Sequence, residues 1–341
     1  MHPAILFEKK PNNIVRCTAC NHYCLIKENS TGICGVRKNI KGELFLLVYG
    51  KSSGSHVDPM EKKPLFHFLP GEKIFSFGTV GCNFGCGFCQ NWNISQITRG
   101  AQSQKEYVID QYGADLYPEQ IIDYCVKNEI KAIAYTYNEP TIFVEYALDV
   151  MKLAKKHKIK NVFVTNGYES KECVELIAPY LDAANIDLKG FTEKFYSNLC
   201  KSRLKPVLET IKLMHKKGIW LELTTLLIPG ENDSEKELKE IAEFIKSVSP
   251  SIPWHISAFH PDFEMLEKQP TKLSSLETAY NIGKKAGLKF VYIGNIISDK
   301  YENTYCPKCN ELVIKRMGYQ VQNFLKNGRC KCGEKIAGVW K

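Results

Sequence analysis

Eleven of the fourteen cysteines fall into three clusters, and one of these clusters lacks a fourth member. The stretch GCNFGCGFCQNW (81–92) places Cys82, Cys86 and Cys89 in a C-x3-C-x2-C array. Four thiolates close a tetrahedral metal site, whereas three thiolates on a 4Fe–4S cluster leave one iron free to bind a small molecule. A zinc ion with its fourth ligand elsewhere is the alternative, although zinc cysteines usually come in C-x2-C pairs. The array therefore predicts an open iron–sulfur cluster.

The two other clusters contain four cysteines each. Without a secretion signal, their spacings favour metal sites over disulfides. The N-terminal set, C-x2-C-x3-C-x9-C, predicts zinc or an auxiliary iron–sulfur cluster, and zinc is favoured because it can supply folding energy that a short segment lacks. The C-terminal set joins a C-x2-C knuckle to a tighter C-x-C pair and predicts a zinc ribbon or rubredoxin-like site. The members are Cys17, Cys20, Cys24 and Cys34, and Cys306, Cys309, Cys330 and Cys332.

The elements that must position these cysteines alternate between β-rich runs and amphipathic stretches. Six or more βα units in a row imply a parallel sheet, either rolled into a barrel or left open. The triad follows the first of these strands, in the loop at its carboxyl end, where such folds build active sites. Three isolated cysteines, Cys125, Cys173 and Cys200, lie in helical patterns and are expected to be buried as small apolar residues. The expected strands are 74–80, 131–137, 161–167, 183–189, 219–229 and 253–259, with a possible further strand at 289–295.

Two helix starts and one helix end carry local signals. Ser234 followed by Glu237 predicts a capping box, and Ser274 with Glu277 predicts a second one. Gly287 is expected to end the last helix, because glycine adopts the left-handed conformation that closes a helix.

The composition, with 44% hydrophobic and 24% charged residues in 341, fits a globular protein with one large domain and small appendages. No apolar run approaches a membrane span and the N-terminus becomes charged too soon for a signal peptide, so a cytoplasmic protein is expected. The net charge of +9 permits an anionic partner but does not require one. The expected units are a cysteine-rich metal-binding segment at 1–55, a core at 56–299 and a ribbon-like segment at 300–341.

The triad, with Phe88 before its last cysteine, resembles the signature of the radical S-adenosylmethionine (SAM) superfamily. The resemblance implies a partial or full parallel (β/α) barrel and a 4Fe–4S cluster held by the triad. The open iron would chelate the amino and carboxylate groups of SAM. One electron would then cleave SAM to methionine and a 5′-deoxyadenosyl radical that abstracts a substrate hydrogen.

Motifs at later strand ends resemble SAM-binding elements of the same superfamily. YTYNEPT (135–141) is similar to a Gly-Gly-Glu-Pro element, but Tyr137 and Asn138 replace the glycines. VTNG (164–167) is similar to an Asp-Thr-Asn-Gly element near the ribose, but Val164 replaces the acid. The matching residues still predict a shared SAM site at these strand ends.

Two further motifs match more specific relatives. IDLK (186–189) matches the Asp-x-Lys element of glycyl-radical-enzyme activating enzymes, and AFHP (258–261) carries a histidine where those enzymes have one near SAM. An ordinary ion pair is the alternative for Asp187 and Lys189, because residues two apart on a strand share a face. The implied SAM-binding residues are Phe88, Asn138, Glu139, Thr165, Asn166, Asp187, Lys189, Thr224 and His260.

Longer segments resemble the radical SAM component of the AmmeMemoRadiSam system over essentially the whole chain. Three of them are RCTACNHYCLIKENSTGICGVRKN (16–39), DPMEKKPLFHFLPG (58–71) and GCNFGCGFCQNWNISQ (81–96). The resemblance implies Memo-like and AMMECR-like partners, a flavodoxin- or ferredoxin-type electron donor and a protein, peptide or RNA substrate. A glycyl-radical-enzyme activating enzyme is the alternative, although neither appendage resembles the auxiliary-cluster insertion of some such enzymes. A non-catalytic zinc- or nucleic-acid-binding protein is the alternative from another class.

Overall fold

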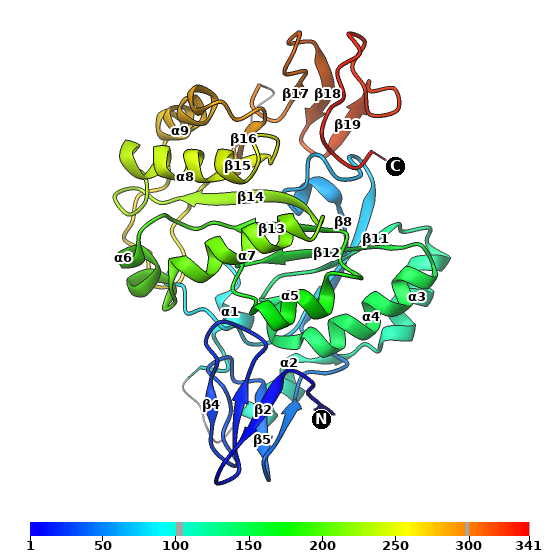
Figure 1. The fold of residues 1–341 in the computed structure, drawn as a ribbon, viewed down its shortest axis with the longest axis vertical. Coiled ribbons are helices and arrows are strands. Elements are labelled where there is room, and N and C mark those ends of the chain that lie inside the picture. Colours follow the sequence, from blue (N-terminus) through cyan, green and yellow to red (C-terminus); the bar gives the residue numbers. More distant parts are fainter. Residues whose placement is uncertain (100–104, 297–299, 341) are drawn as a thin grey trace.

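A computed structural model describes residues 1–99, 105–296 and 300–340. An eight-stranded sheet with the order β16-β15-β14-β13-β12-β11-β9-β8 forms its centre (Figure 1). Every neighbouring pair from β9 to β16 is parallel, and only β8 runs antiparallel to β9. The strands are β8 (Gly54–Pro59), β9 (Lys73–Gly78), β11 (Ala132–Tyr135), β12 (Lys160–Thr165), β13 (Ala183–Asp187), β14 (Trp220–Leu227), β15 (Trp254–Ala258) and β16 (Val291–Gly294).

The sheet confirms the expected α/β fold with parallel strands. Each of the six expected strands is present, and so is the possible one near residue 290. Their apolar composition follows from burial on both faces, as in β11, where all four residues are buried. In the part of the chain that the structure describes, β8 and β16 are the two edges of the sheet and do not pair. Of the two forms expected, a partial or a full barrel, the open, partial form is therefore the observed one.

Helices cover the sheet, and none of those described combines the length and apolarity that a bilayer crossing requires. Amphipathic patterns produce the longer helices, because an apolar stripe on each helix packs against the sheet. They are α1 (Trp92–Ser95), α2 (Lys105–Tyr112), α3 (Pro118–Lys127), α4 (Val144–Lys156), α5 (Lys171–Ile177), α6 (Glu193–Phe195), α7 (Leu204–Lys216), α8 (Glu235–Val248) and α9 (Leu273–Ala286), with the 3-10 helices η1 (Met60–Lys62) and η2 (Pro140–Phe143) and the π-helix η3 (Tyr196–Cys200).

The capping box predicted at α8 is half confirmed, because the Glu237 side chain accepts from the Phe191 N–H and not from Ser234, and the signals at α9 partly fail. The Ser234 hydroxyl caps α8 by accepting from the Glu237 N–H at 3.3 Å. Gly287 ends α9 with φ +95° as expected. The predicted cap at Ser274 is wrong, because α9 already begins at Leu273 after Lys272. The hydrogen bond from the N–H of the nearby Thr271 to a loop carbonyl fixes the entry of this helix instead.

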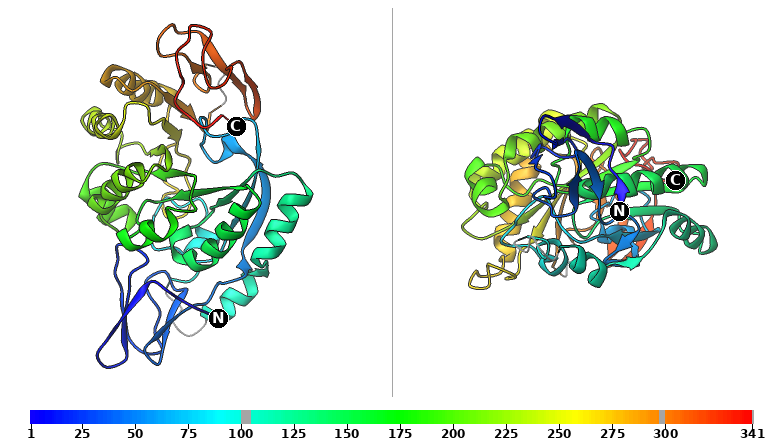
Figure 2. Two further views of the ribbon diagram at one scale, coloured as in Figure 1. Left: turned by 45° about the vertical axis from the view of Figure 1, so that its right-hand side comes forward. Right: turned by 90° about the horizontal axis from the view of Figure 1, so that it is seen from below.

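The N-terminal segment forms two small three-stranded sheets at one end of the molecule (Figure 2). Its loops contact segments that follow β9 and β12, so it lies at the carboxyl ends of the parallel strands. A buried guanidinium fastens it to α4, because Arg37 donates to the Glu145 carboxylate and, at 3.1 Å, to the Ile142 carbonyl. The strands are β1 (His2–Pro3), β2 (Phe7–Lys10), β3 (Ile14–Cys17), β4 (Leu25–Ile26), β5 (Arg37–Ile40), β6 (Glu43–Leu46) and β7 (Lys51–Ser52), with β10 (Ala114–Asp115) paired to β7.

The C-terminal segment lies at the opposite end of the sheet (Figures 1 and 2). Buried Arg316 fastens it to the chain before β9, donating to the Phe66 carbonyl at 2.6 Å. His67 adds a second link, with its Nδ1 at 2.7 Å from the Ala337 carbonyl. The expected boundary at residue 299 lies outside the described residues. The strands are β17 (Thr304–Tyr305), β18 (Leu312–Met317) and β19 (Gln320–Asn323).

Candidate functional site

The cysteine triad lies in the loop that follows β9, at the carboxyl end of the strand. The π-helix η3 holds this loop through its backbone: the Gly85 N–H donates to the Cys200 carbonyl and the Gly87 N–H to the Leu199 carbonyl, both at 3.0 Å. A Cβ on Gly85 would come within 2.9 Å of the Arg99 guanidinium. Glycine at this position therefore lets the loop fold tightly against its neighbours.

The three thiols lie in a largely buried environment. Burial raises the pKa of Cys82. A hydrogen bond with the Cys200 thiol, together with burial, raises the pKa of Cys86. Cys89 is half buried, and its sulfur lies 3.1 Å from the Ser95 hydroxyl. Since metal ligands must be deprotonated, cluster binding at this loop is coupled to proton release.

Cys200 corrects one expectation from the sequence. It is buried, as expected for a small apolar residue, but its thiol also contacts Cys86. Its position in a helical pattern gave no sign of this contact, because the chain brings η3 to the triad only in the tertiary fold.

The spacing of the triad tests which metal group these residues fit. Among the described residues, ligand atoms of three or more His, Cys, Asp or Glu gather within 4.8 Å of one another only at the C-terminal cysteine set. Two sulfurs on one zinc ion are at most about 4.6 Å apart, because each Zn–S bond is about 2.3 Å. In a 4Fe–4S cluster each cysteine binds a different iron, which accepts a wider spacing. The triad therefore fits a cluster and not a single ion.

Glu139 lies beyond β11, where donors from two neighbouring strand ends converge on its buried carboxylate. It accepts from the Thr165 hydroxyl at 2.9 Å, the Asn166 N–H at 2.8 Å and the Thr141 N–H at 3.0 Å. Burial raises the pKa of Glu139 although these hydrogen bonds oppose the shift. The Asn166 side chain also donates to Asn83 Oδ1 at 2.7 Å, which joins this network to the triad loop.

Asp187 and Lys189 form an ion pair at the end of β13, with 2.7 Å between Oδ2 and Nζ. Burial is the largest single influence on Lys189 and lowers its pKa, but the charge and hydrogen bond of Asp187, together with the charges of Cys86 and Cys200, outweigh burial and the pKa rises. Nζ also lies 5.8 Å from the ring centre of Phe88, so the pair lies beside the triad loop. Thr224, opposite Asp187 in the sheet, donates to Asn185 Oδ1 at 2.9 Å.

Two implied SAM-binding residues stand apart from this group in different ways. His260 is exposed, and its ring contacts the carbonyl of adjacent Pro261 at 3.4 Å. Asn138 turns toward the protein and donates to the Gly81 carbonyl at 2.8 Å and to the Thr79 hydroxyl at 3.0 Å. Asn138, which stands where the superfamily element has a glycine, thus stabilises the chain from Thr79 to Gly81 that leads into the triad loop.

Asn83, between the first two cysteines of the triad, was not among the residues singled out in the sequence. Its carbonyl accepts from Arg99 at 3.1 Å and contacts His22 Nε2 at 2.9 Å. Within the described residues its buried side-chain nitrogen has no hydrogen-bond partner. The position inside the triad is the signal that could have identified it.

The two four-cysteine sets differ in spacing. At the C-terminus the sulfurs of Cys306 and Cys332 are 3.7 Å apart, and those of Cys309 and Cys330 are 3.6 Å apart. The four sulfurs all lie within 4.8 Å of one another, close enough to hold a metal ion. The N-terminal cysteines instead line a cavity, described below, and do not gather within the same limit.

Comparison with known proteins places the chain in a family. A model of the radical SAM superfamily matches residues 77–245. The uncharacterized protein MJ0808 of Methanocaldococcus jannaschii is 41% identical over 341 residues, covering 98% of this chain and 99% of that protein. The pyruvate formate-lyase-activating enzyme of Clostridium pasteurianum is 19% identical over 177 residues, covering 49% of this chain and 67% of that enzyme.

Among solved structures, Streptococcus suis SuiB bound to the precursor peptide SuiA has a TM-score of 0.51 at 17% identity, covering 69% of this chain and 51% of that one. This likeness supports the fold. The cysteine triad falls inside the matched region, in the loop after β9. The chain therefore belongs to the radical SAM superfamily, and it is an enzyme of the kind that uses a 4Fe–4S cluster and SAM.

Proposed function

We propose that the protein cleaves SAM reductively at the triad of Cys82, Cys86 and Cys89 and uses the 5′-deoxyadenosyl radical to abstract a hydrogen from a macromolecular or partner-presented substrate. The observation that carries this proposal is a juxtaposition. A triad too widely spaced for one metal ion lies beside the Asp187–Lys189 ion pair at adjoining strand ends. When bound, the cluster supplies the electron for this chemistry.

The residues around the triad have distinct proposed roles. The carboxylate of Asp187 and the ammonium of Lys189 have the charges needed to bind the amino and carboxylate ends of SAM. Glu139 and Asn166 orient the neighbouring loops through the hydrogen bonds described above. The unpartnered nitrogen of Asn83 supports a further contact to a bound molecule, because a buried donor without a partner is costly. Thr165, Thr224, Asn138, Phe88 and His260 complete the proposed SAM-binding set.

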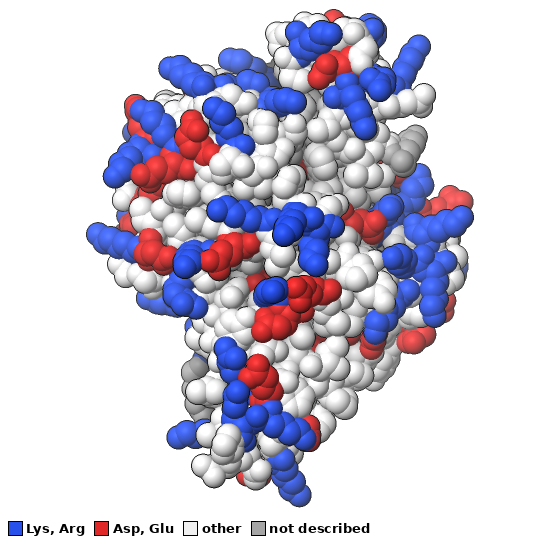
Figure 3. Space-filling view, viewed as in Figure 1, with Lys and Arg blue, Asp and Glu red and all other residues white. Residues whose placement is uncertain are grey.

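The substrate is proposed to be a protein or peptide in an AmmeMemoRadiSam-type system, with Memo-like and AMMECR-like proteins as partners and a flavodoxin or ferredoxin as electron donor. Basic and acidic side chains both lie on the face in Figure 3, with basic side chains gathered over the C-terminal segment at the top and along the right-hand side. The similarity to activating enzymes and the Asp-x-Lys motif favour the second candidate, abstraction of hydrogen from a protein glycine.

The C-terminal set is proposed to hold zinc. Sulfurs at the corners of a tetrahedral zinc site are about 3.8 Å apart, and the observed separations of 3.6 and 3.7 Å agree with this value. The proposed units are residues 1–55, 56–299 and 300–341, in a cytoplasmic protein.

The central test is SAM cleavage by anaerobically reconstituted protein with a strong reductant. We expect 5′-deoxyadenosine and methionine, and we expect neither from the variant with Cys82, Cys86 and Cys89 all replaced by alanine. Cys125→Ala is the matched control, because Cys125 is a buried thiol on α3 outside the site. Formation of 5′-deoxyadenosine by the triple variant would refute the proposal.

A further inference from the structure

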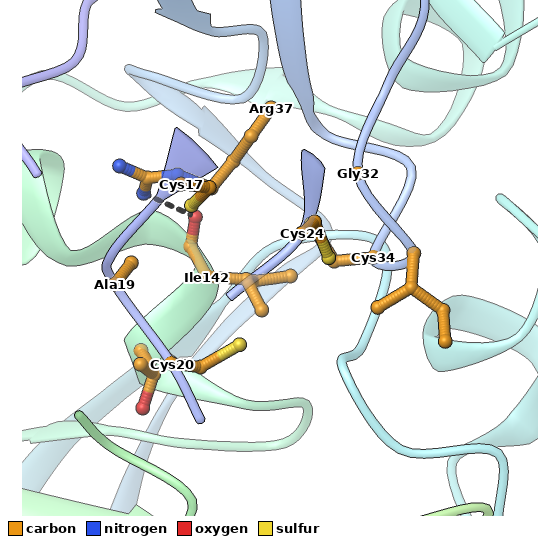
Figure 4. Close-up of a pocket in the computed structure, with 10 residues that line it drawn as sticks. Cys17, Ala19, Cys20, Cys24, Gly32, Cys34, Arg37 and Ile142 are labelled. Carbon is orange, nitrogen blue, oxygen red and sulfur yellow. Dashed lines mark hydrogen bonds between the residues drawn. The ribbon is translucent and has the colours of Figure 1, made fainter. Parts of the chain in front are cut away.

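The four N-terminal cysteines surround a cavity at the carboxyl end of the sheet (Figure 4). Cys17, Cys20 and Cys34 are buried and Cys24 is half buried. Cys17 ends β3, Cys20 and Cys24 lie in the connection from β3 to β4, and Cys34 lies in the turn before β5, so only the folded segment brings them around one space. The convergence of four thiols on a cavity indicates a site for a metal group.

The spacing of these thiols argues against a single zinc ion. The four sulfurs do not all lie within 4.8 Å of one another among the described residues, whereas two sulfurs on zinc can be at most about 4.6 Å apart. The C-terminal set in the same molecule meets the limit with separations of 3.6 and 3.7 Å. The sulfurs of the central triad also do not all lie within 4.8 Å of one another. That triad lies in the region that matches the radical SAM superfamily, whose members use a 4Fe–4S cluster.

The lining of the cavity suits a cluster. Most of the other lining residues are apolar or small, among them Ala19, Gly32 and Ile142. The remaining wall includes the Arg37 guanidinium, whose bond to the Ile142 carbonyl appears as a dashed line in Figure 4. Four thiolates bring negative charge into a buried site, and a buried cation offsets part of that cost. Arg37 thus stabilises both the segment and the charge that the site would carry.

The same site touches the loop of the central triad. A Cβ on Gly81, which precedes the triad, would lie 2.6 Å from the Cys34 carbonyl, so the two backbones are in direct contact. The Thr98 hydroxyl donates a hydrogen bond to the same Cys34 carbonyl at 2.9 Å. His22, between two cysteines of the N-terminal set, contacts the Asn83 carbonyl inside the triad at 2.9 Å. The two cysteine sites are therefore neighbours joined through short backbone contacts.

We propose that Cys17, Cys20, Cys24 and Cys34 hold a second 4Fe–4S cluster that passes electrons to the central cluster. The electron-transfer part rests on the function proposed above. One electron would pass from the second cluster to the central cluster. The second cluster would thereby be oxidised by one electron and the central cluster reduced by one electron. The central cluster would then give this electron to SAM. A flavodoxin or ferredoxin restores the electron to the second cluster. This assignment replaces the zinc favoured from the sequence.

Metal analysis of the wild-type protein tests the cluster without any variant that could misfold. After reconstitution with iron and sulfide, we expect about eight irons per chain, the content of two 4Fe–4S clusters. About four irons would overturn the proposal. In a Cys20→Ala, Cys34→Ala double variant the iron content should fall to about four per chain. A loss of zinc with unchanged iron would identify a zinc site instead, and Cys173→Ala, another buried thiol, is the control.

The electron step is tested by stoichiometry. Fully reduced wild-type protein, freed of reductant and then mixed with SAM, should yield about two 5′-deoxyadenosine per chain, because each cleavage consumes one electron. The double variant should yield about one. A wild-type yield of one, with eight irons present, would refute electron transfer between the clusters. A yield of zero would refute the proposed function, while the iron content would still decide the second cluster.

Discussion

The N-terminal and C-terminal segments of this protein have the same number of clustered cysteines but differ in how they present them. At the C-terminus the sulfurs lie within 4.8 Å of one another, and Cys309 and Cys332 are exposed. At the N-terminus the thiols are largely buried, more widely spaced and arranged around a cavity. The first arrangement fits one ion at the surface, and the second fits a larger group inside the molecule.

The two segments also lie at opposite ends of the sheet, and each is fastened by one buried arginine. Arg37 holds the N-terminal segment against α4, where the strand ends form the candidate SAM site. Arg316 holds the C-terminal segment against the chain before β9. Both segments carry four cysteines, so the number of ligands does not distinguish their proposed roles. Their positions do: the N-terminal set lies at the carboxyl ends of the strands beside the candidate SAM site, and the C-terminal set lies at the opposite end of the sheet.

Loss of the C-terminal metal should have the largest effect. Structural zinc supplies about 10–16 kcal/mol to small zinc units, so this segment should unfold without it. We expect the Cys309→Ala, Cys332→Ala double variant to lose one zinc per chain and to become protease-sensitive after residue 300, with central iron retained. Metal analysis and limited proteolysis measure both effects. Loss of the central cluster would show that the two ends are not independent.

Replacement of each buried arginine should have the second-largest effect, and the two replacements should affect the two segments differently. Replacing one partner of a buried ion pair typically costs about 3–5 kcal/mol, because the other charge stays buried. We expect such a loss in Arg37→Met, which strands Glu145, and in Arg316→Met, which strands Glu61. Urea unfolding measures the stability. Only Arg37→Met should also lower the iron content, and equal iron in both variants would contradict the comparison.

Two aspartates at opposite ends of β13 allow a matched comparison, with a smaller expected effect on SAM affinity. Asp187→Asn should weaken SAM binding by roughly 1.5–3 kcal/mol, or about ten- to a hundred-fold, through loss of a charge-assisted hydrogen bond. Asp182→Asn is the control, because Asp182 directly precedes β13 and pairs with Lys160 at the start of β12. Equilibrium dialysis of the reconstituted proteins with SAM gives both affinities. Unchanged affinity in Asp187→Asn would return Asp187 and Lys189 to an ordinary ion pair.

The smallest expected effect is a pH dependence at the C-terminal contact. Burial lowers the pKa of His67 from 6.5 to about 4. Between these values the unfolded chain binds a proton that the folded protein does not, so stability falls as the pH decreases through this window. The slope should be about 1.4 kcal/mol per pH unit, and His67→Gln should remove it.

Urea unfolding at several pH values measures this slope. His157→Gln, a change at an exposed position, is the control and should keep it. The same slope in His67→Gln and in the wild type would show that another group is responsible.

The sequence was sufficient for much of the fold. The strands were predictable because segments buried on both faces must be apolar over their whole length, as β11 is. The cap at Ser234 was predictable because an N-cap hydrogen bond joins neighbouring residues. At α9 the same reasoning failed, since Glu277 accepts from the distant Tyr301 hydroxyl and the helix begins before Ser274.

The candidate site divides in the same way. The sequence by itself determined the triad, because its chemistry depends on residue type and short spacing. It also determined the pair at 187 and 189, since alternate residues of a strand share a face. Only the tertiary structure decided that Cys200 contacts Cys86, that His260 is exposed and that Cys34 lies against Gly81. The physical reason is distance along the chain: local spacing fixes which ligands are available, whereas packing of remote segments fixes how far apart they stand and what they face.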